Sequence, residues 1–176
     1  MRNLGSDWFF VGYCLLSLLI AVTCDVEALL HDRATYGKVA PIVNWPPPFL
    51  VRALHQWGDD FDPLLNARPL WFKVCFGLEM TLQVPYYIVA IYAFTKGCEW
   101  IRLPTVIYAS MSLTTMISFS RANSSHAIVL VEQFYGEFAT PAPLVILASY
   151  LPFAFAPAAF LYRARGVTMF EKPKQA

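Results

Sequence analysis

Four runs of apolar residues, each about 20 residues long, most constrain how this chain can fold. A helix of this length crosses a bilayer, because each residue adds about 1.5 Å and the hydrocarbon core is about 30 Å thick. Of the 176 residues, 57% are hydrophobic and only 14% are charged. The sequence therefore predicts an all-α, polytopic membrane protein, a bundle of four transmembrane helices at residues 8–30, 70–94, 101–120 and 141–162.

The chain has no internal repeat, so residues 1–176 are predicted to form a single membrane domain. The first run is longer than the apolar part of a signal peptide and is interpreted as a retained span. Lys and Arg are enriched on the cytosolic side of membrane proteins. Here they follow the fourth run and separate the second from the third: Arg163, Arg165, Lys172, Lys174, Lys96 and Arg102. Both termini are therefore predicted to be cytosolic, with residues 163–176 as a basic tail and the first connector in the lumen.

The first connector carries helix signals of its own. Prolines at residues 46–48 precede a set of apolar residues at helical spacing, which predicts a short amphipathic helix in the lumenal loop: Phe49, Leu50, Ala53, Leu54 and Trp57. Asp62 then precedes Pro63, a pair typical of an N-cap followed by the first helical position. Asp62 is therefore predicted to have a structural role.

Glu79 lies deep inside the second run. Counting from Trp71 at the interface, eight residues at about 1.5 Å each place its backbone about 12 Å deep, too far for the side chain to reach the headgroups. Glu79 is therefore expected to face the protein interior, and Gln83 at i+4 and Tyr86 at i+7 share its face. Pro85 removes a backbone hydrogen bond just beyond Gln83, which predicts a kink that widens a cavity.

Asp25, near the end of the first run, is expected at a similar depth because consecutive spans are antiparallel. A carboxyl group inside a bilayer costs about 2.5–3.5 kcal/mol on insertion scales, so two of them indicate a function. Two adjacent carboxyl groups in a low dielectric do not both ionise easily. Our hypothesis is that Asp25 is the anion and Glu79 its protonated partner, together anchoring a hydrophobic amine. In the structural alternative, both acids bond polar backbone or pair with Lys73.

The third and fourth runs supply the remaining candidates. Tyr108 and Thr115 share one face of the third run, although hydroxyl-bearing residues there also suit ordinary helix packing. The fourth run combines prolines with aromatic residues such as Tyr150, which is typical of the wall around a flat apolar ligand. The candidate ligand-binding residues are Asp25, Glu79, Gln83, Tyr108, Thr115 and Tyr150, with Asp62 and Pro85 as support.

Other residues point to smaller features. The four cysteines lack metal-ligand spacing, so neither a metal nor a cofactor is predicted. A net charge of +1 gives no reason to expect a nucleic-acid partner. Lys172 and Lys174 have the spacing of a dilysine signal for retrieval to the endoplasmic reticulum, or form only a basic anchor. Asn123 begins a sequon for glycosylation that is either used or unused.

An ordered set of short motifs runs from about Phe61 to Thr115. It comprises DPLL at 62–65, WFK at 71–73, Glu79-x-x-x-Gln83-x-Pro85, YAFTKG at 92–97, WIR at 100–102, IY at 107–108 and TT at 114–115. Together these motifs resemble the sigma-2 receptor family of EXPERA-domain membrane proteins, to which the emopamil-binding sterol isomerase is related. The likeness is looser around Asp25 and residues 150–157.

The resemblance implies a multi-pass protein of the endoplasmic reticulum membrane, commonly a homodimer, that binds sterols or oxysterols and hydrophobic amines and regulates cholesterol handling, with sterol-trafficking membrane proteins as partners. It implies that Asp25 and Glu79 form an acidic pair that anchors ligands. Gln83, Tyr108, Thr115 and Tyr150 match pocket positions of the family. Met111 and Phe153 depart from its pattern, so the ligand preference stays open.

Three other functions remain as alternatives. Sterol isomerisation calls for intramembrane acid and base groups that include a histidine. His31, His55 and His126 all fall in predicted connectors, so the chain is predicted not to be an enzyme. Fungal relatives are linked to mitochondrial precursor proteins at the reticulum surface, which gives a second alternative. The third is a proton-coupled carrier, although the chain lacks the inverted repeat common in carriers.

Overall fold

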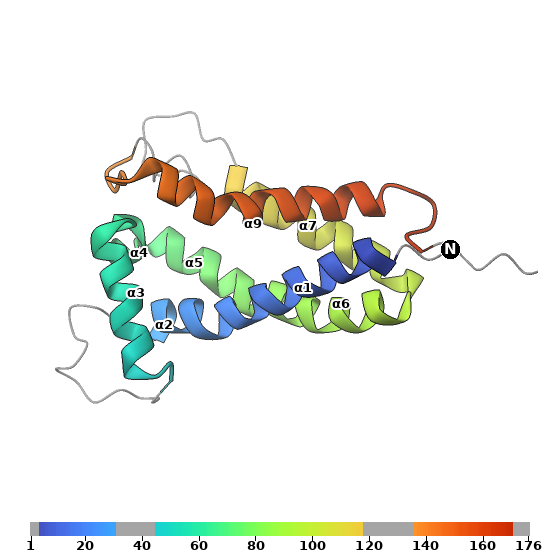
Figure 1. Cartoon of the computed structure of the whole chain (residues 1–176), viewed down its shortest axis with the longest axis horizontal. Coiled ribbons are helices and arrows are strands. Elements are labelled where there is room, and N and C mark those ends of the chain that lie inside the picture. Colours follow the sequence, from blue (N-terminus) through green and yellow to red (C-terminus); the bar gives the residue numbers. More distant parts are fainter. Residues whose placement is uncertain (1–3, 31–44, 118–135, 171–176) are drawn as a thin grey trace, which may run out of the picture.

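The computed structural model of the chain describes residues 4–30, 45–117 and 136–170. Every regular element in these ranges is a helix, and they contain no strand. Long helices run side by side along the molecule, and two short helices lie across the end opposite the N-terminus (Figure 1). The predicted all-α membrane fold is therefore confirmed.

Three continuous helical rods are long and apolar enough to cross a bilayer: Asp7–Leu30, Leu70–Lys96 and Pro143–Ala164. The first rod joins α1 (Leu4–Ile20), the π-helix η1 (Ala21–Asp25) and α2 (Val26–Leu30). The second joins α5 (Leu70–Leu78), the π-helix η2 (Glu79–Gln83) and α6 (Val84–Lys96). The third is α9 (Pro143–Ala164), which continues through Pro152 and Pro157.

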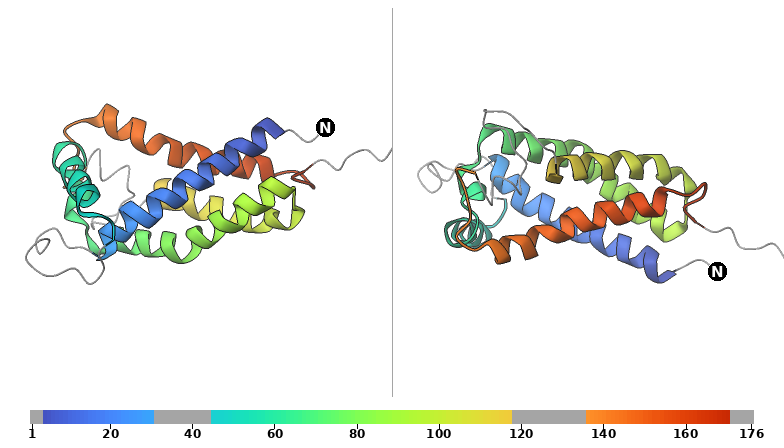
Figure 2. Two further views of the ribbon diagram at one scale, coloured as in Figure 1. Left: turned by 60° about the horizontal axis from the view of Figure 1, so that its bottom comes forward. Right: turned by 90° about the horizontal axis from the view of Figure 1, so that it is seen from above.

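The remaining long helix is α7 (Arg102–Ile117), which follows the short 3-10 turn η3 (Glu99–Ile101). It occupies the third predicted span up to residue 117, and residues 118–120 of that span lie outside the described residues. α7 packs antiparallel along α9, and α1 packs antiparallel along α6 (Figures 1 and 2). Their outward faces carry exposed apolar side chains suited to lipid, including Leu15, Leu19, Ile88, Ile107 and Phe155.

Aromatic rings form much of the core between the rods. Phe160 lies with its ring centroid 4.5 Å from that of Phe10 and 5.6 Å from that of Phe94, so three helices meet there. Tyr86 and Tyr108 stack with their centroids 4.2 Å apart. Since lipid gives no hydrophobic force between spans, such close packing is what holds the helices together.

Two short helices, α3 (Pro48–Asp60) and α4 (Pro63–Ala67), cross the end of the bundle where α2 ends and α5 begins (Figures 1 and 2). Each begins with a proline, at a position where the backbone N–H would have no acceptor within the helix. Asp62 Oδ1 accepts a hydrogen bond from the backbone N–H of Leu65 at 3.2 Å, which makes Asp62 the N-cap of α4. We call α3 and α4 the cap.

Candidate ligand-binding site

A cavity of about 370 Å³ lies between the rods beside the cap. Pockets for small molecules are typically about 300–1,000 Å³ and mostly apolar, with a few placed polar groups. This cavity has that character, since aliphatic and aromatic side chains dominate it. Its lining residues are Ile20, Cys24, Asp25, Leu54, Trp57, Leu65, Phe72, Cys75, Phe76, Glu79, Gln83, Thr115, Met116, Ser149, Tyr150 and Phe153.

The acidic residues lie on the two π-helices. η1 ends at Asp25 and η2 begins at Glu79, and the two segments contact each other. A π-turn bonds residue i to i+5 and so inserts one extra residue into a helix, an arrangement found frequently at functional sites. Two spans far apart in sequence therefore bring a carboxyl group each to one cavity.

A threonine at the centre of each π-helix provides a local reason for the irregular turn. Thr23 Oγ1 donates to the carbonyl of Leu19 at 2.7 Å, and Thr81 Oγ1 donates to the carbonyl of Gly77 at 2.8 Å. Such back-bonding from a side chain competes with the backbone bond of a regular helix and often bends it. Pro85 adds to the effect in the second rod, because it has no N–H to continue the regular ladder.

The two carboxyl groups have different surroundings. Asp25 is only 4% exposed, and its Oδ2 atom has no hydrogen-bond partner among the described residues. Glu79 is half-buried, and the hydroxyl of Tyr87 lies 3.0 Å from its Oε1. No hydrogen bond joins the two carboxyl groups within the described ranges, so the direct proton donation in our hypothesis is not seen in this conformation.

The expectation for Tyr86 is wrong, and the π-turn explains why. In a regular helix, position i+7 returns to the face of Glu79, which is why Tyr86 was expected there. One inserted residue moves that face to i+8, and it is Tyr87 that reaches Glu79 and also lies 3.1 Å from Oε1 of Gln83. Tyr86 instead donates to Thr105 Oγ1 at 3.1 Å in the aromatic core.

Tyr108 also lies in the aromatic core and does not line the cavity. Its hydroxyl donates to the hydroxyl of Tyr13 at 3.1 Å, and the residue is 1% exposed. Helical spacing placed Tyr108 with Thr115, but they stand almost two turns apart along α7, and the cavity reaches only the second of them. Tyr108 therefore contributes packing between α1 and α7 rather than a cavity wall.

The other candidate residues meet at the cavity or its cap. Gln83, Thr115 and Tyr150 line the cavity together with the two acids. The hydroxyl of Tyr150 donates to Oδ2 of Asp62 at 2.6 Å, and Asp62 is fully buried. Asp62 thus joins α9 to the cap while it also caps α4. Asn123, Lys172 and Lys174 lie outside the described residues.

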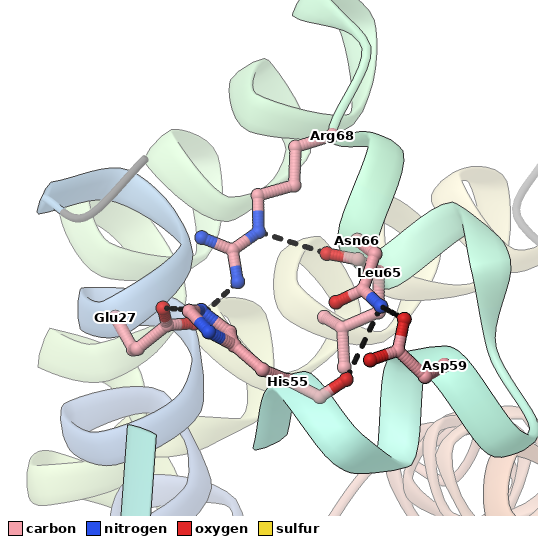
Figure 3. A network of polar contacts seen from close by, with 6 residues as sticks. All are labelled: Glu27, His55, Asp59, Leu65, Asn66 and Arg68. Carbon is pink, nitrogen blue, oxygen red and sulfur yellow. Dashed lines mark hydrogen bonds and ion pairs between the residues drawn. The ribbon is translucent and has the colours of Figure 1, made fainter. Parts of the chain in front are cut away.

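A buried charge cluster beside the cavity was missed at the sequence level. Glu27 is fully buried, and its carboxylate contacts Arg68 at 2.6 Å and His55 at 2.9 Å (Figure 3). The available signal was a second acid at the end of an apolar run, followed by a connector that contains basic residues. We call Glu27, His55 and Arg68 the Glu27 cluster.

The cavity has the chemistry of a binding site for an apolar ligand with one cationic or hydroxyl group. A buried carboxyl oxygen without a partner is costly, and a ligand that donates to it would remove that cost. The described residues contain no group of side chains suited to a metal ion. His55, the histidine of the described ranges, bonds to Glu27 and does not line the cavity.

Comparison with known proteins gives consistent matches. The family model described as EXPERA (expanded EBP superfamily) matches residues 49–164, more than half of the chain. Sigma intracellular receptor 2 of Homo sapiens and that of Macaca fascicularis are each 36% identical to this chain over 114 residues, which is 63% of this chain and 58% of the relative. The Xenopus tropicalis protein of the same name is 31% identical over 113 residues, or 64% of this chain and 60% of the relative. The matched part thus spans less than two thirds of each relative.

Proposed function

Because the chain belongs to the EXPERA (expanded EBP) superfamily, we propose that it is a membrane receptor for sterols or oxysterols and hydrophobic amines, which bind in the cavity beside the cap. The relatives are named as receptors, which favours binding over catalysis as the main activity. The mostly apolar lining would accept the body of either ligand class. Its few polar groups would select the orientation of the ligand.

The observation that carries the proposal is the environment of Asp25. This carboxyl group is buried in an apolar wall, and its Oδ2 atom lacks a partner within the described residues. A protonated amine would supply both a hydrogen bond and an opposite charge. Glu79 lines the same cavity and carries a second carboxyl group. With one of the two groups ionised and the other protonated, the pair would have a net charge of −1 and would bind one cation.

Binding of a tricyclic amine tests the proposal. The purified protein in lipid nanodiscs would be titrated with tritiated imipramine, a hydrophobic tertiary amine. Asp25→Asn preserves the size of the side chain and removes its charge, and we expect it to weaken binding by about tenfold or more. Glu79→Gln should weaken it as well, because Asp25 is then the one carboxyl group left in the lining that the structure describes.

A control variant separates the cavity from charge in general. Asp7→Asn/Arg163→Met removes the ion pair of 3.1 Å between α1 and α9, which lies outside the cavity lining. This variant should bind imipramine as the wild type does. Unchanged binding of imipramine by Asp25→Asn would contradict the assignment of Asp25 as the anchor for the amine.

We propose further that the protein is not an enzyme. A sterol isomerase needs a proton donor and acceptor beside the double bond. Among the described residues, the cavity lining contains two carboxyl groups but no histidine. Incubation of the purified protein with a Δ8-sterol should give no shifted double bond, and turnover abolished by Glu79→Gln would establish the isomerase alternative.

The cellular setting also belongs to the proposal. We place the protein in the endoplasmic reticulum membrane as a homodimer, with both termini in the cytosol and a role in cholesterol handling, on the family resemblance and the distribution of Lys and Arg. Cysteine accessibility on each side of sealed microsomes would test the orientation. Assistance to mitochondrial precursor proteins is the alternative role.

A further inference from the structure

The Glu27 cluster ties the first membrane rod to both helices of the cap. Glu27 lies on α2, and each of its carboxylate oxygens has a different partner. Oε2 accepts from Arg68 Nη2 at 2.6 Å and Oε1 lies 2.9 Å from His55 Nε2 (Figure 3). Arg68 is the C-cap residue of α4 and His55 lies on α3, so one buried carboxylate holds three helices.

The two cap helices are themselves joined, so the cluster holds them as a unit. Asn66 Nδ2 donates to the carbonyl of His55 at 3.2 Å and to Asp59 Oδ1 at 3.1 Å. Gly58 lies so close to Asn66 that a β-carbon there would overlap its side chain. The Arg68 guanidinium is oriented from its own helix, because its Nε donates to the carbonyl of Leu65 at 2.8 Å.

Asp25 lies between two contacts that hold the first rod, one at Glu27 and one at Val22. Glu27 follows it by two residues, and Val22 precedes it by three. The carbonyl of Val22, inside the π-helix, accepts a hydrogen bond from the indole Nε1 of Trp45 at 2.6 Å. The segment that precedes the cap therefore holds η1 on one side of Asp25, and the Glu27 cluster holds α2 on the other.

These attachments matter because a π-turn is a rare and irregular form of helix. If η1 relaxed to a regular α-helix, the register beyond it would change by one residue, which is a rotation of about 100°. Asp25 would then turn out of the cavity wall that it shares with Glu79. Relaxation also requires Glu27 to leave Arg68 and His55, so the cluster opposes it.

We propose that the Glu27 cluster is a positioning element for ligand binding: by clamping α2 to the cap through Arg68 and His55, it keeps Asp25 directed into the cavity. This inference rests on the proposed function. A buried ion pair is often no more stabilising than apolar residues of similar size, and its attested use is to specify one arrangement over another. Glu27, His55 and Arg68 do not line the cavity themselves, and the cluster meets its wall through the bond from Arg68 to the carbonyl of Leu65.

The decisive variant is Glu27→Gln/Arg68→Met. It removes both charges together, so neither is left buried and uncompensated, and we expect the fold to be retained. Two probes would be compared in nanodiscs, tritiated imipramine as the cation and a diazirine-bearing cholesterol as the neutral ligand. We expect imipramine affinity to fall by about tenfold, because a misdirected carboxylate loses a charge-assisted hydrogen bond, while sterol photolabelling stays within about twofold.

Two further variants separate positioning from folding. Glu27→Asp/Arg68→Lys keeps both charges but shortens Glu27 and replaces the guanidinium, and it should restore binding only in part. Asp7→Asn/Arg163→Met, the matched ion pair outside the cavity lining, should leave both probes unaffected. An equal loss of amine and sterol binding in the Glu27→Gln/Arg68→Met variant would overturn positioning in favour of a general structural role.

The outcomes also separate this inference from the proposed function. If Asp25→Asn loses amine binding but Glu27→Gln/Arg68→Met binds as the wild type does, the acidic anchor stands and the positioning role is wrong. If Asp25→Asn itself binds imipramine normally, the anchor fails and the positioning role fails with it. Selective loss of the amine in both variants supports both.

Discussion

The hydrogen bond between Tyr150 and Asp62 should contribute measurably to the stability of the fold. It is short, at 2.6 Å, and it links α9 to a fully buried carboxyl group in the cap. Hydrogen bonds to charged groups contribute about 1.5–3 kcal/mol, and the half-buried position of Tyr150 favours the lower end. Tyr150→Phe should therefore lower the free energy of unfolding by about 1.5 kcal/mol.

A double-mutant cycle isolates that contribution. Asp62→Ala should cost more than Tyr150→Phe, because it also removes the N-cap bond to Leu65, which typically contributes about 1 kcal/mol. Once Asp62 is absent, adding Tyr150→Phe should cost little, and the coupling energy should be about 1.5 kcal/mol.

Equilibrium unfolding by SDS in mixed micelles, followed by tryptophan fluorescence, gives the four free energies. Tyr162→Phe is the control, because Tyr162 lies exposed on the same helix and its hydroxyl accepts from Arg165 at the surface. It should change the free energy of unfolding by less than about 0.5 kcal/mol. A coupling energy near zero between Tyr150 and Asp62 would refute the assignment of this bond as a tie between α9 and the cap.

Three further predictions concern other contacts. Gly58→Ala should destabilise the cap through its overlap with Asn66, seen as faster amide hydrogen exchange in α3 and α4. Tyr87→Phe removes the hydroxyl that lies within hydrogen-bond distance of Glu79 and Gln83. It should lower the unfolding free energy by about 1 kcal/mol in the same SDS titration. Glu99 accepts from the backbone N–H groups of residues 169 and 170 at 2.8 and 2.6 Å, so Glu99→Gln should release this segment to carboxypeptidase, whereas equal resistance would contradict the contact.

Apolar length and proline position were enough to predict the helical rods and the cap. Residues 70–94 were predicted as a span and the second rod is Leu70–Lys96, because the apolar run itself determines which residues can face lipid. The Asp62–Pro63 pair likewise identified the start of α4, since capping depends on neighbouring residues alone. Both features depend on residues that are close together in the chain, so a single sequence is enough to predict them.

The side-chain partners in the cavity were less predictable, because they depend on register and on contacts across the fold. A regular period of 3.6 residues selected Tyr86, whereas one inserted residue in η2 brings Tyr87 to Glu79. The threonine at the centre of each π-helix is a local feature of the sequence that could have indicated the irregular turn. Glu27 and Arg68 are 41 residues apart, and no local pattern links them.

Asp25 and Glu27 make an internal comparison that leads to a last prediction. Both acids are buried near the end of one rod, but Glu27 has two basic partners, whereas Asp25 Oδ2 has none among the described residues. An uncompensated buried charge is destabilising, so Asp25→Asn should raise the unfolding free energy of the ligand-free protein by about 1 kcal/mol or more, while Glu27→Gln should lower it.

Bound ligand should reverse the order of stability of the wild type and Asp25→Asn. Bound at one hundred times its dissociation constant, imipramine should stabilise the wild type by about 2.7 kcal/mol and Asp25→Asn far less. SDS titration with and without the amine measures both differences. If Asp25→Asn lowered the stability of the ligand-free protein as Glu27→Gln does, then Asp25 would be a satisfied structural acid, and the physical reason for assigning it to a ligand would be lost.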